Sequence, residues 1–283
     1  MLLVNVDLFC SDKGEGLPLI VHHGGPGLDQ VAIENGLSPL ANELRLVCFE
    51  HRGTGRSAQP NGSNPYHIDN FVEDVVALSK ALGVERFAML GHSFGGIVAQ
   101  HVALAHPGLL SHLILVCAPS SDDYIHDVEA ALPELLPPAA LAELSRLAAG
   151  EPSKEVMRRS LELLVPVYFR DRAKVAALGL DAIKFGPASQ AVWDSLEGFD
   201  LRPRLPEIEV PTLVVTGAHD RSVTPERAKE TAALLPDSTL LVLEGSGHYP
   251  FLEEPGKLIA GIRAFFMAKP KKKKKGGLFG RGS

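Results

Sequence analysis

The sequence contains few of the features that mark a secreted, membrane-spanning or disulfide-stabilised protein. Three cysteines, Cys10, Cys48 and Cys117, occur among 283 residues, and none belongs to a Cys-x-x-Cys pair. Each lies in an apolar, strand-like stretch, so we expect buried thiols in a reducing compartment, without disulfides or bound metal. No run of 18 or more apolar residues is present, which excludes a typical membrane-spanning helix. The first ten residues lack a basic start and reach Asp7 early, unlike a secretory signal peptide. A cytoplasmic location is therefore predicted.

Positive charge is scarce outside the last 15 residues. Seven of the 28 lysines and arginines lie in residues 269–283, which leaves 21 basic against 34 acidic residues in the rest of the chain. An acidic body is unsuited to phosphate contacts, so we expect no nucleic-acid partner. The tail itself, KPKKKKKGGLFGRGS, is predicted to be disordered, because like charges repel and glycine and serine bury little apolar surface.

Short apolar runs recur along the chain. They do not alternate with polar residues, which is typical of strands buried on both faces of a parallel sheet. The six runs are residues 17–23, 44–50, 86–92, 112–118, 211–217 and 238–245. Helix-like segments lie at residues 69–82, 95–105, 225–235 and 255–268. The alternation of strand and helix predicts an α/β fold with a mostly parallel, doubly wound sheet.

Residues 119–201 interrupt this alternation. The segment contains helix-like stretches separated by prolines, and no strand-like run. We therefore expect an inserted helical cap on a core that is built from residues 1–118 and 202–268.

The motif with the clearest chemistry is GHSFGG at residues 91–96, which contains the pattern Gly-x-Ser-x-Gly. It follows a strand-like run and precedes a helix-like segment, which is the context of a nucleophile elbow that exposes a reactive serine. So tight a turn leaves no room for side chains two residues before and after the serine, hence the glycines. The following helix directs its N-terminus at Ser93, where a developing negative charge is stabilised. Ser93 is the predicted nucleophile.

A serine hydroxyl needs a base, and the base needs an acid that orients it. In folds with such an elbow the chain order is Ser, acid, His. Asp220 follows the run 211–217, and His248 follows the run 238–245. Both lie beyond strand carboxyl ends, where an open α/β sheet places its sites. We therefore assign Asp220 as the acid and His248 as the base. His219 is the rival base, but it lies beside the acid on the same loop.

An acyl-transfer site also needs donors for the oxyanion. HGGPG at residues 23–27 follows the first strand-like run, and its glycines let backbone N–H groups approach a substrate closely. We assign the N–H groups of Gly25 and Phe94 as the two donors. The loop at residues 50–57 is interpreted as support for the site. Glu50 and His51 in that loop lack further ligands at a suitable spacing, so no metal and no cofactor are expected.

These motifs resemble those of the α/β-hydrolase superfamily and, within it, the proline iminopeptidase-like branch. The motifs that carry the similarity are HGGPG (23–27), HRGTGRS (51–57), GHSFGG (91–96), PTLVVTGAHD (211–220) and GSGH (245–248). The resemblance extends over about residues 15–265 and is weakest in the cap. It implies an α/β-hydrolase fold, a Ser-His-Asp triad and removal of an N-terminal residue, often proline.

Two positions depart from the pattern of that branch. Its members hold the free α-amine of the substrate with acidic residues, one directly after the catalytic aspartate and one late in the cap after Gly-Pro. Here Arg221 takes the first position, and Gly186-Pro187 is followed by Ala188 and Ser189. A cation at Arg221 would repel an ammonium group if it faced the pocket. The departures favour a neutral or anionic small-molecule substrate.

The sequence thus predicts a serine hydrolase that cleaves an ester, lactone or amide bond of a small molecule through an acyl-enzyme. One alternative is an aminopeptidase of the iminopeptidase type. Another is a different use of the same site, as a C–C hydrolase, a cofactor-free haloperoxidase-like enzyme or a non-catalytic ligand receptor. Trp193 and Arg221 are candidate substrate contacts. Tyr168, Phe169 and Phe185 fit either the lining of an acyl pocket or the packing of the cap onto the sheet.

Overall fold

The computed structural model describes residues 6–25, 27–62, 64–151, 153–180 and 188–268, except for the side chains of residues 188–190 and 193. The tail at residues 269–283, for which we predict disorder, lies outside the described residues. Phe185 and the Gly186-Pro187 pair also lie outside them.

A seven-stranded sheet runs through the described part of the chain. Its strands are β1 (Cys10–Lys13), β2 (Leu17–His22), β3 (Leu44–Phe49), β4 (Phe87–His92), β5 (Leu110–Val116), β6 (Thr212–Gly217) and β7 (Ser238–Leu243). Their order is β1-β3-β2-β4-β5-β6-β7, and every neighbouring pair is parallel except β1 with β3. The six predicted strands and the mostly parallel sheet are therefore confirmed. The apolar pattern does not predict β1, because its four residues, CSDK, are mostly polar.

Helices connect the strands of the core. They are α1 (Val31–Leu37), α2 (Ile68–Ala81), α3 (Phe94–Ala105), α9 (Pro225–Leu234), α10 (Pro250–Glu253) and α11 (Pro255–Met267), with 3-10 turns at Ser38–Asn42 and Leu205–Glu207. Helices α2, α3, α9 and α11 match the four predicted segments to within one residue at each end. Helix α9 begins at Pro225 after Thr224, as expected for a proline at the first helical position.

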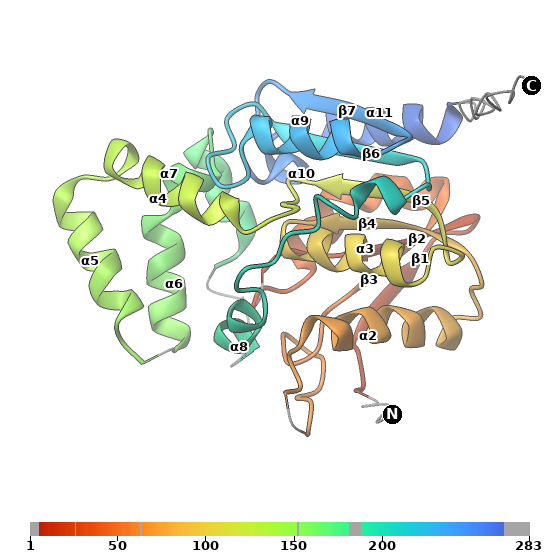
Figure 1. Ribbon diagram of the computed structural model, residues 1–283, viewed down its shortest axis with the longest axis horizontal. Coiled ribbons are helices and arrows are strands. Elements are labelled where there is room, and N and C mark those ends of the chain that lie inside the picture. Colours follow the sequence, from red (N-terminus) through yellow and green to blue (C-terminus); the bar gives the residue numbers. More distant parts are fainter. Residues whose placement is uncertain (1–5, 26, 63, 152, 181–187, 269–283) are drawn as a thin grey trace, which may run out of the picture.

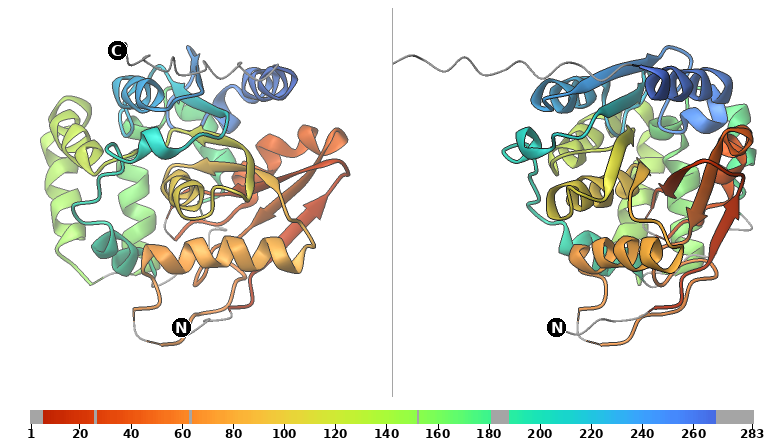
Figure 2. Two further views of the ribbon diagram at one scale, coloured as in Figure 1. Left: turned by 45° about the vertical axis from the view of Figure 1, so that its right-hand side comes forward. Right: turned by 90° about the vertical axis from the view of Figure 1, so that its right-hand side faces the viewer.

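Apolar side chains fill a layer on each face of the sheet, and Figure 2 shows the helices on both sides of it. Phe71 of α2 and Val98 of α3 are fully buried on one face. Leu258 and Ile262 of α11 are fully buried on the other. Full burial of such a side chain stabilises the fold by about 1.5–3 kcal/mol. The strands, and the loops that follow them, are therefore held from both sides.

The direction of winding reverses between β2 and β4. From β2 the sheet extends through β3 to β1, and from β4 it extends through β5 and β6 to β7. Strands β2 and β4 are direct neighbours, with His22 paired to Gly91. In open α/β sheets, ligands bind beyond the carboxyl ends of the strands at such a switch point. The two loops that leave this point are those of Gly25 and Ser93.

A helical segment separates β5 from β6. It comprises α4 (Asp123–Leu135), α5 (Pro138–Ala148), α6 (Lys154–Leu163), α7 (Val165–Tyr168), a 3-10 turn at Arg172–Leu178 and α8 (Ala188–Ser195). A β-bridge between Ser121 and Asp200 joins its two ends, and Figure 1 shows α4 to α7 grouped beside the core. On this basis we propose that residues 119–201 form a cap on a core of residues 1–118 and 202–268. Within the described residues, no helix is long and apolar enough to cross a membrane.

All three cysteines are free thiols. Cys48 in β3 and Cys117 after β5 are buried, as expected, but Cys10 is only half-buried. It lies in β1, which is an edge strand of the described sheet. The prediction of a buried thiol is therefore wrong for Cys10.

Candidate active site

Ser93 lies in the turn between β4 and α3, and its backbone is strained. Its φ is +52° and its ψ is −120°, a conformation that residues other than glycine rarely adopt. A Cβ atom at Gly91 would overlap the carbonyl oxygen of Gly95, and one at Gly95 would overlap that of His22. Only glycine therefore fits at these two positions. The Ser93 N–H donates to the Val116 carbonyl at 3.0 Å, which ties the turn to β5.

Two backbone N–H groups lie near this turn without an acceptor among the described residues. The N–H of Phe94 opens α3 and belongs to the first-turn donors that a helix cannot satisfy internally. Gly25 follows β2, has a φ of +133° and borders the same cavity as Ser93. At the preceding Gly24, a Cβ atom would lie 3.4 Å from that of Ser93, so this loop approaches the elbow closely. Both N–H groups therefore remain candidate oxyanion donors.

His248 and Asp220 form a buried hydrogen-bonded pair. The Nδ1 atom of His248 lies 2.8 Å from Oδ2 of Asp220, and the two residues are 2% and 1% exposed. The other carboxylate oxygen accepts hydrogen bonds from the N–H groups of Ser222 and Val223 at 2.8 and 2.9 Å. With Nδ1 held by the carboxylate, Nε2 of His248 is the nitrogen left to exchange a proton. The rival His219 is exposed and is absent from the described lining of the cavity.

A cavity of about 530 Å³ is enclosed by core loops and cap helices. Ser93, Gly25 and His248 border it from the core. The cap contributes a mostly apolar lining, which includes Tyr124, Ile125, Val128, Met157, Leu161, Leu164, Tyr168 and Phe199. Volume and lining suit a small ligand with an apolar portion.

The charged groups of this cavity are all acidic within the described residues. Asp122, Asp194 and Glu197 line it, and no lysine or arginine does so in that part of the chain. Asp122 lies at the start of the cap, and the other two lie in or just after α8. Sequence reasoning did not identify these carboxylates, because an acidic residue in a helical segment is usually a solvated surface group. They come to one cavity only because the two ends of the cap lie together.

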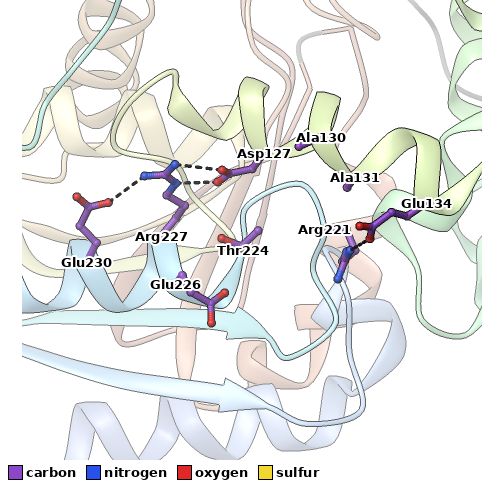
Figure 3. A pocket seen from close by; sticks show the side chains of 9 residues that line it. All are labelled: Asp127, Ala130, Ala131, Glu134, Arg221, Thr224, Glu226, Arg227 and Glu230. Carbon is purple, nitrogen blue, oxygen red and sulfur yellow. Dashed lines mark hydrogen bonds and ion pairs between the residues drawn. The ribbon is translucent and has the colours of Figure 1, made fainter.

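Arg221 lines a different pocket, between α4 and α9, which Figure 3 shows. Its guanidinium forms an ion pair of 3.0 Å with Glu134 of α4, beside the ion pair of Arg227 and Asp127 at 2.7 Å. The Arg221 N–H donates to the carbonyl of Val167. Arg221 could repel an ammonium group of a substrate only if it faced the cavity of Ser93. In this structure it faces the other pocket.

The aromatic residues of the cap divide between the two expected roles. Tyr168 borders the cavity. Phe169 is buried and stacks on Tyr249 at a ring distance of 4.8 Å, so it packs the cap onto the core. The side chain of Trp193, a candidate substrate contact, lies outside the described residues. Burial and the charge of Asp220 raise the pKa of Tyr168 to about 12, so its phenol is neutral at neutral pH.

Three histidines are buried behind the glycine loop. His23 stacks on His51 at a ring distance of 4.1 Å, and His22 lies 5.4 Å from His51. Burial lowers the pKa of His22 to about 3 and that of His23 to about 4. Within the described residues, the Nε2 atoms of His22 and His51 have no hydrogen-bond partner. The site is thus supported by neutral rings, in agreement with the structural role expected for the loop at residues 50–57.

One group of side chains brings potential metal ligands together. Atoms of Cys117, Asp220 and His248 lie within 4.8 Å of one another, and all three residues are buried. A metal would require the thiolate, whereas burial and the charge of Asp220 raise the pKa of Cys117. Asp220 and His248 are also bonded to each other. We therefore assign no metal to this group.

A model of the alpha/beta hydrolase family matches residues 19–262. The chain belongs to this family. A proline iminopeptidase from Heyndrickxia coagulans is 29% identical over 269 residues, covering 90% of this chain and 92% of the relative. A non-heme chloroperoxidase from Streptomyces lividans is 30% identical over 274 residues, covering 92% and 95%.

The chain is also similar to the solved structure of a thermophilic esterase from Thermogutta terrifontis. The TM-score is 0.73 and the sequence identity is 26%. The match covers 92% of this chain and 93% of that chain. The predicted α/β-hydrolase fold and the resemblance to the proline iminopeptidase-like branch are confirmed.

Proposed function

We propose that this chain is a serine hydrolase that cleaves an ester, lactone or amide bond of a small molecule. The observation that carries the proposal is the arrangement around one cavity. Ser93, strained at the N-terminus of a helix, borders the cavity together with His248, whose Nδ1 lies 2.8 Å from Asp220. A nucleophile, a base and an acid that orients the base are the three parts that acyl transfer requires.

The proposed reaction has two halves. The hydroxyl oxygen of Ser93 attacks the substrate carbonyl while Nε2 of His248 takes its proton, and Asp220 stabilises the imidazolium. The N–H groups of Gly25 and Phe94 donate to the oxyanion, which collapses to an acyl-enzyme as the leaving group takes the proton from His248. Water then gives a proton to His248, attacks the acyl carbon and releases the acid, and Ser93 regains its proton.

The cavity lining supports a substrate with an apolar portion and no negative charge. Its apolar cap side suits an alkyl or aryl group. Asp122 and Glu197 would repel an anionic substrate, and the described lining includes no lysine or arginine. The sequence favours a neutral or anionic substrate because it places a cation, Arg221, next to Asp220. In the structure Arg221 lines another pocket. We therefore propose neutral or cationic substrates.

The same carboxylates support a second candidate function, removal of an N-terminal residue from a peptide. A free α-amine is cationic, and Asp122 and Glu197 would attract it. The similarity to a relative that is named a proline iminopeptidase adds to this support.

Steady-state rates on p-nitrophenyl esters of graded acyl length, measured beside prolyl and alanyl p-nitroanilides, separate the two candidates. Ester turnover without anilide cleavage supports the first, and efficient prolyl anilide cleavage supports the second. In both cases Ser93→Ala should lower kcat by 10³-fold or more, as a rough bound. The variant should also lose covalent labelling by a fluorophosphonate. Turnover that survives Ser93→Ala, or ligand binding without any turnover in the unaltered chain, would overturn the mechanism.

A further inference from the structure

The last residues of α7 and those that follow it meet both loops that carry the proposed acid and base. The Arg221 N–H, directly after Asp220, donates to the Val167 carbonyl at 3.2 Å. The N–H of His248 donates to the Tyr168 carbonyl at 2.7 Å. A Cβ atom at Gly247 would overlap that same Tyr168 carbonyl, so the two backbones are in close contact. This part of the cap therefore lies directly against the loop of the base.

Glu253, the last residue of α10, joins the same two parts through its side chain. Its Oε1 accepts hydrogen bonds from the N–H groups of Arg170 and Asp171 in the cap, at 3.0 and 2.8 Å. Its Oε2 accepts from the N–H of Gly247, at 2.7 Å. One carboxylate thus binds three backbone donors, two in the cap and one beside His248. Hydrogen bonds to an ionised acceptor are roughly twice as strong as neutral ones.

We infer that Glu253 is a positioning residue, which couples the cap to the placement of His248. The inference rests on the proposed function, in which His248 is the base. Asp220 has its own local anchors in Ser222 and Val223. The backbone of the base is held mainly from outside its loop. Its N–H binds Tyr168, its carbonyl lies 2.8 Å from Nε2 of His92, and the N–H of its neighbour Gly247 binds Glu253.

This arrangement predicts an effect on the chemical step and not on substrate binding. Glu253 does not belong to the described lining of the cavity, so its removal deletes no side chain that would contact the substrate. A misplacement of a catalytic group by about 1 Å is enough to lower a rate by about 10²-fold. Glu253→Ala should therefore lower kcat by about 10- to 100-fold and change KM by less than about threefold.

Two further variants separate positioning from a general loss of stability. In Glu253→Gln, the amide oxygen still accepts from one side, either Gly247 or the cap, but the amide nitrogen cannot accept from the other. We expect an intermediate loss of kcat, about three- to tenfold, with thermal unfolding close to that of the unaltered chain. Glu254→Ala is the matched control. Glu254 accepts from the N–H of Gly245 in the same loop at 2.6 Å and pairs with Lys257. Within the described residues it binds no backbone N–H of the cap, and its only interaction with the cap is the attraction of the Arg170 charge.

The test uses the full chain and its best p-nitrophenyl ester, with kcat, KM, fluorophosphonate labelling rate and thermal unfolding measured for each variant. A loss of kcat and of labelling rate in both Glu253 variants, with KM retained and Glu254→Ala within about threefold of the unaltered chain, supports the inference. Equal losses in the Glu253 and Glu254 variants would overturn it, as would retention of kcat in folded Glu253→Ala. If the unaltered chain itself shows neither turnover nor labelling of Ser93, the proposed function is what fails.

Discussion

Oδ2 of Asp220 lies 2.8 Å from Nδ1 of His248, and the other oxygen of the same carboxylate is bound by the N–H groups of Ser222 and Val223. The carboxylate can therefore accept from His248 only through Oδ2. This division fixes which ring nitrogen carries the proton and leaves Nε2 as the proposed base.

Asp220→Asn should lower kcat by about 10⁴-fold, the size typical of this change in a serine protease triad. The asparagine oxygen would replace Oδ1 at the two backbone donors, so the amide nitrogen would face Nδ1 and favour the wrong tautomer. Steady-state kinetics on the best ester measures the loss. Asp200→Asn, at a surface carboxylate paired with Arg202, is the control and should retain activity. A loss smaller than tenfold in Asp220→Asn would argue against the assigned acid.

The positive φ of Ser93 predicts a trade between stability and activity. A strained backbone of this kind costs about 1–3 kcal/mol, and glycine avoids most of that cost. Ser93→Gly and Ser93→Ala should both be inactive, but the glycine variant should be more stable than the alanine variant by about 1 kcal/mol. Urea unfolding of both variants measures the difference. Equal stabilities would show that the turn is not strained.

The sequence was sufficient to predict the sheet and the central elements of the site. Strands buried on both faces leave a nearly continuous apolar run, and the residues after β4, β6 and β7 necessarily meet at one edge of a parallel sheet. Ser93, Asp220 and His248 could therefore be proposed together. Strand β1 could not be predicted, since an edge strand of four residues needs little apolar pattern.

Side-chain directions around the cavity could not be predicted in the same way. The position of Arg221 next to Asp220 suggested a substrate contact, but its backbone N–H binds Val167 and its side chain turns to Glu134. Glu197 is exposed and also lines the cavity, and no sequence pattern indicates the second property. Periodicity identifies which face of a helix is apolar, whereas the partner of that face depends on tertiary contacts.

The acidic lining predicts selectivity by substrate charge. Glu197→Gln should raise kcat/KM for an ester that carries a carboxylate, relative to a neutral ester of equal size, by about two- to fivefold, because a partly solvated charge acts weakly. Arg221→Ala is the matched control, because Arg221 lies in the other pocket, and it should leave this ratio unchanged. The ratio is measured at low ionic strength and again in 0.5 M salt, where screening should reduce the effect. If only Arg221→Ala changes the ratio of kcat/KM between the charged and the neutral ester, Arg221 and not Glu197 acts on the substrate charge.

The buried histidines behind the glycine loop predict a loss of stability in mild acid. Burial holds the pKa of His22 at about 3 and that of His23 at about 4, whereas both titrate near 6.5 in an unfolded chain. Below pH 6.5 the unfolded state therefore binds protons that the folded state does not, and the free energy of unfolding falls as the pH falls towards 4. Each such histidine contributes a slope of about 1.4 kcal/mol per pH unit in this window. Above pH 6.5 this contribution is complete and no longer changes with pH.

Urea unfolding of the unaltered chain and of His22→Asn at pH 5, 6, 7 and 8 isolates this contribution from that of the carboxylates. His22→Asn should be less stable at pH 8, because it leaves a cavity beside Phe49 and His51. Its stability should nevertheless fall less steeply below pH 6, by about 1.4 kcal/mol per pH unit, because one neutral buried histidine is gone. His67→Asn, at a partly exposed position before α2 where asparagine can still cap the helix, should keep the original slope. If the slopes of all three proteins coincide, His22 accepts its proton in the folded state as readily as in the unfolded one.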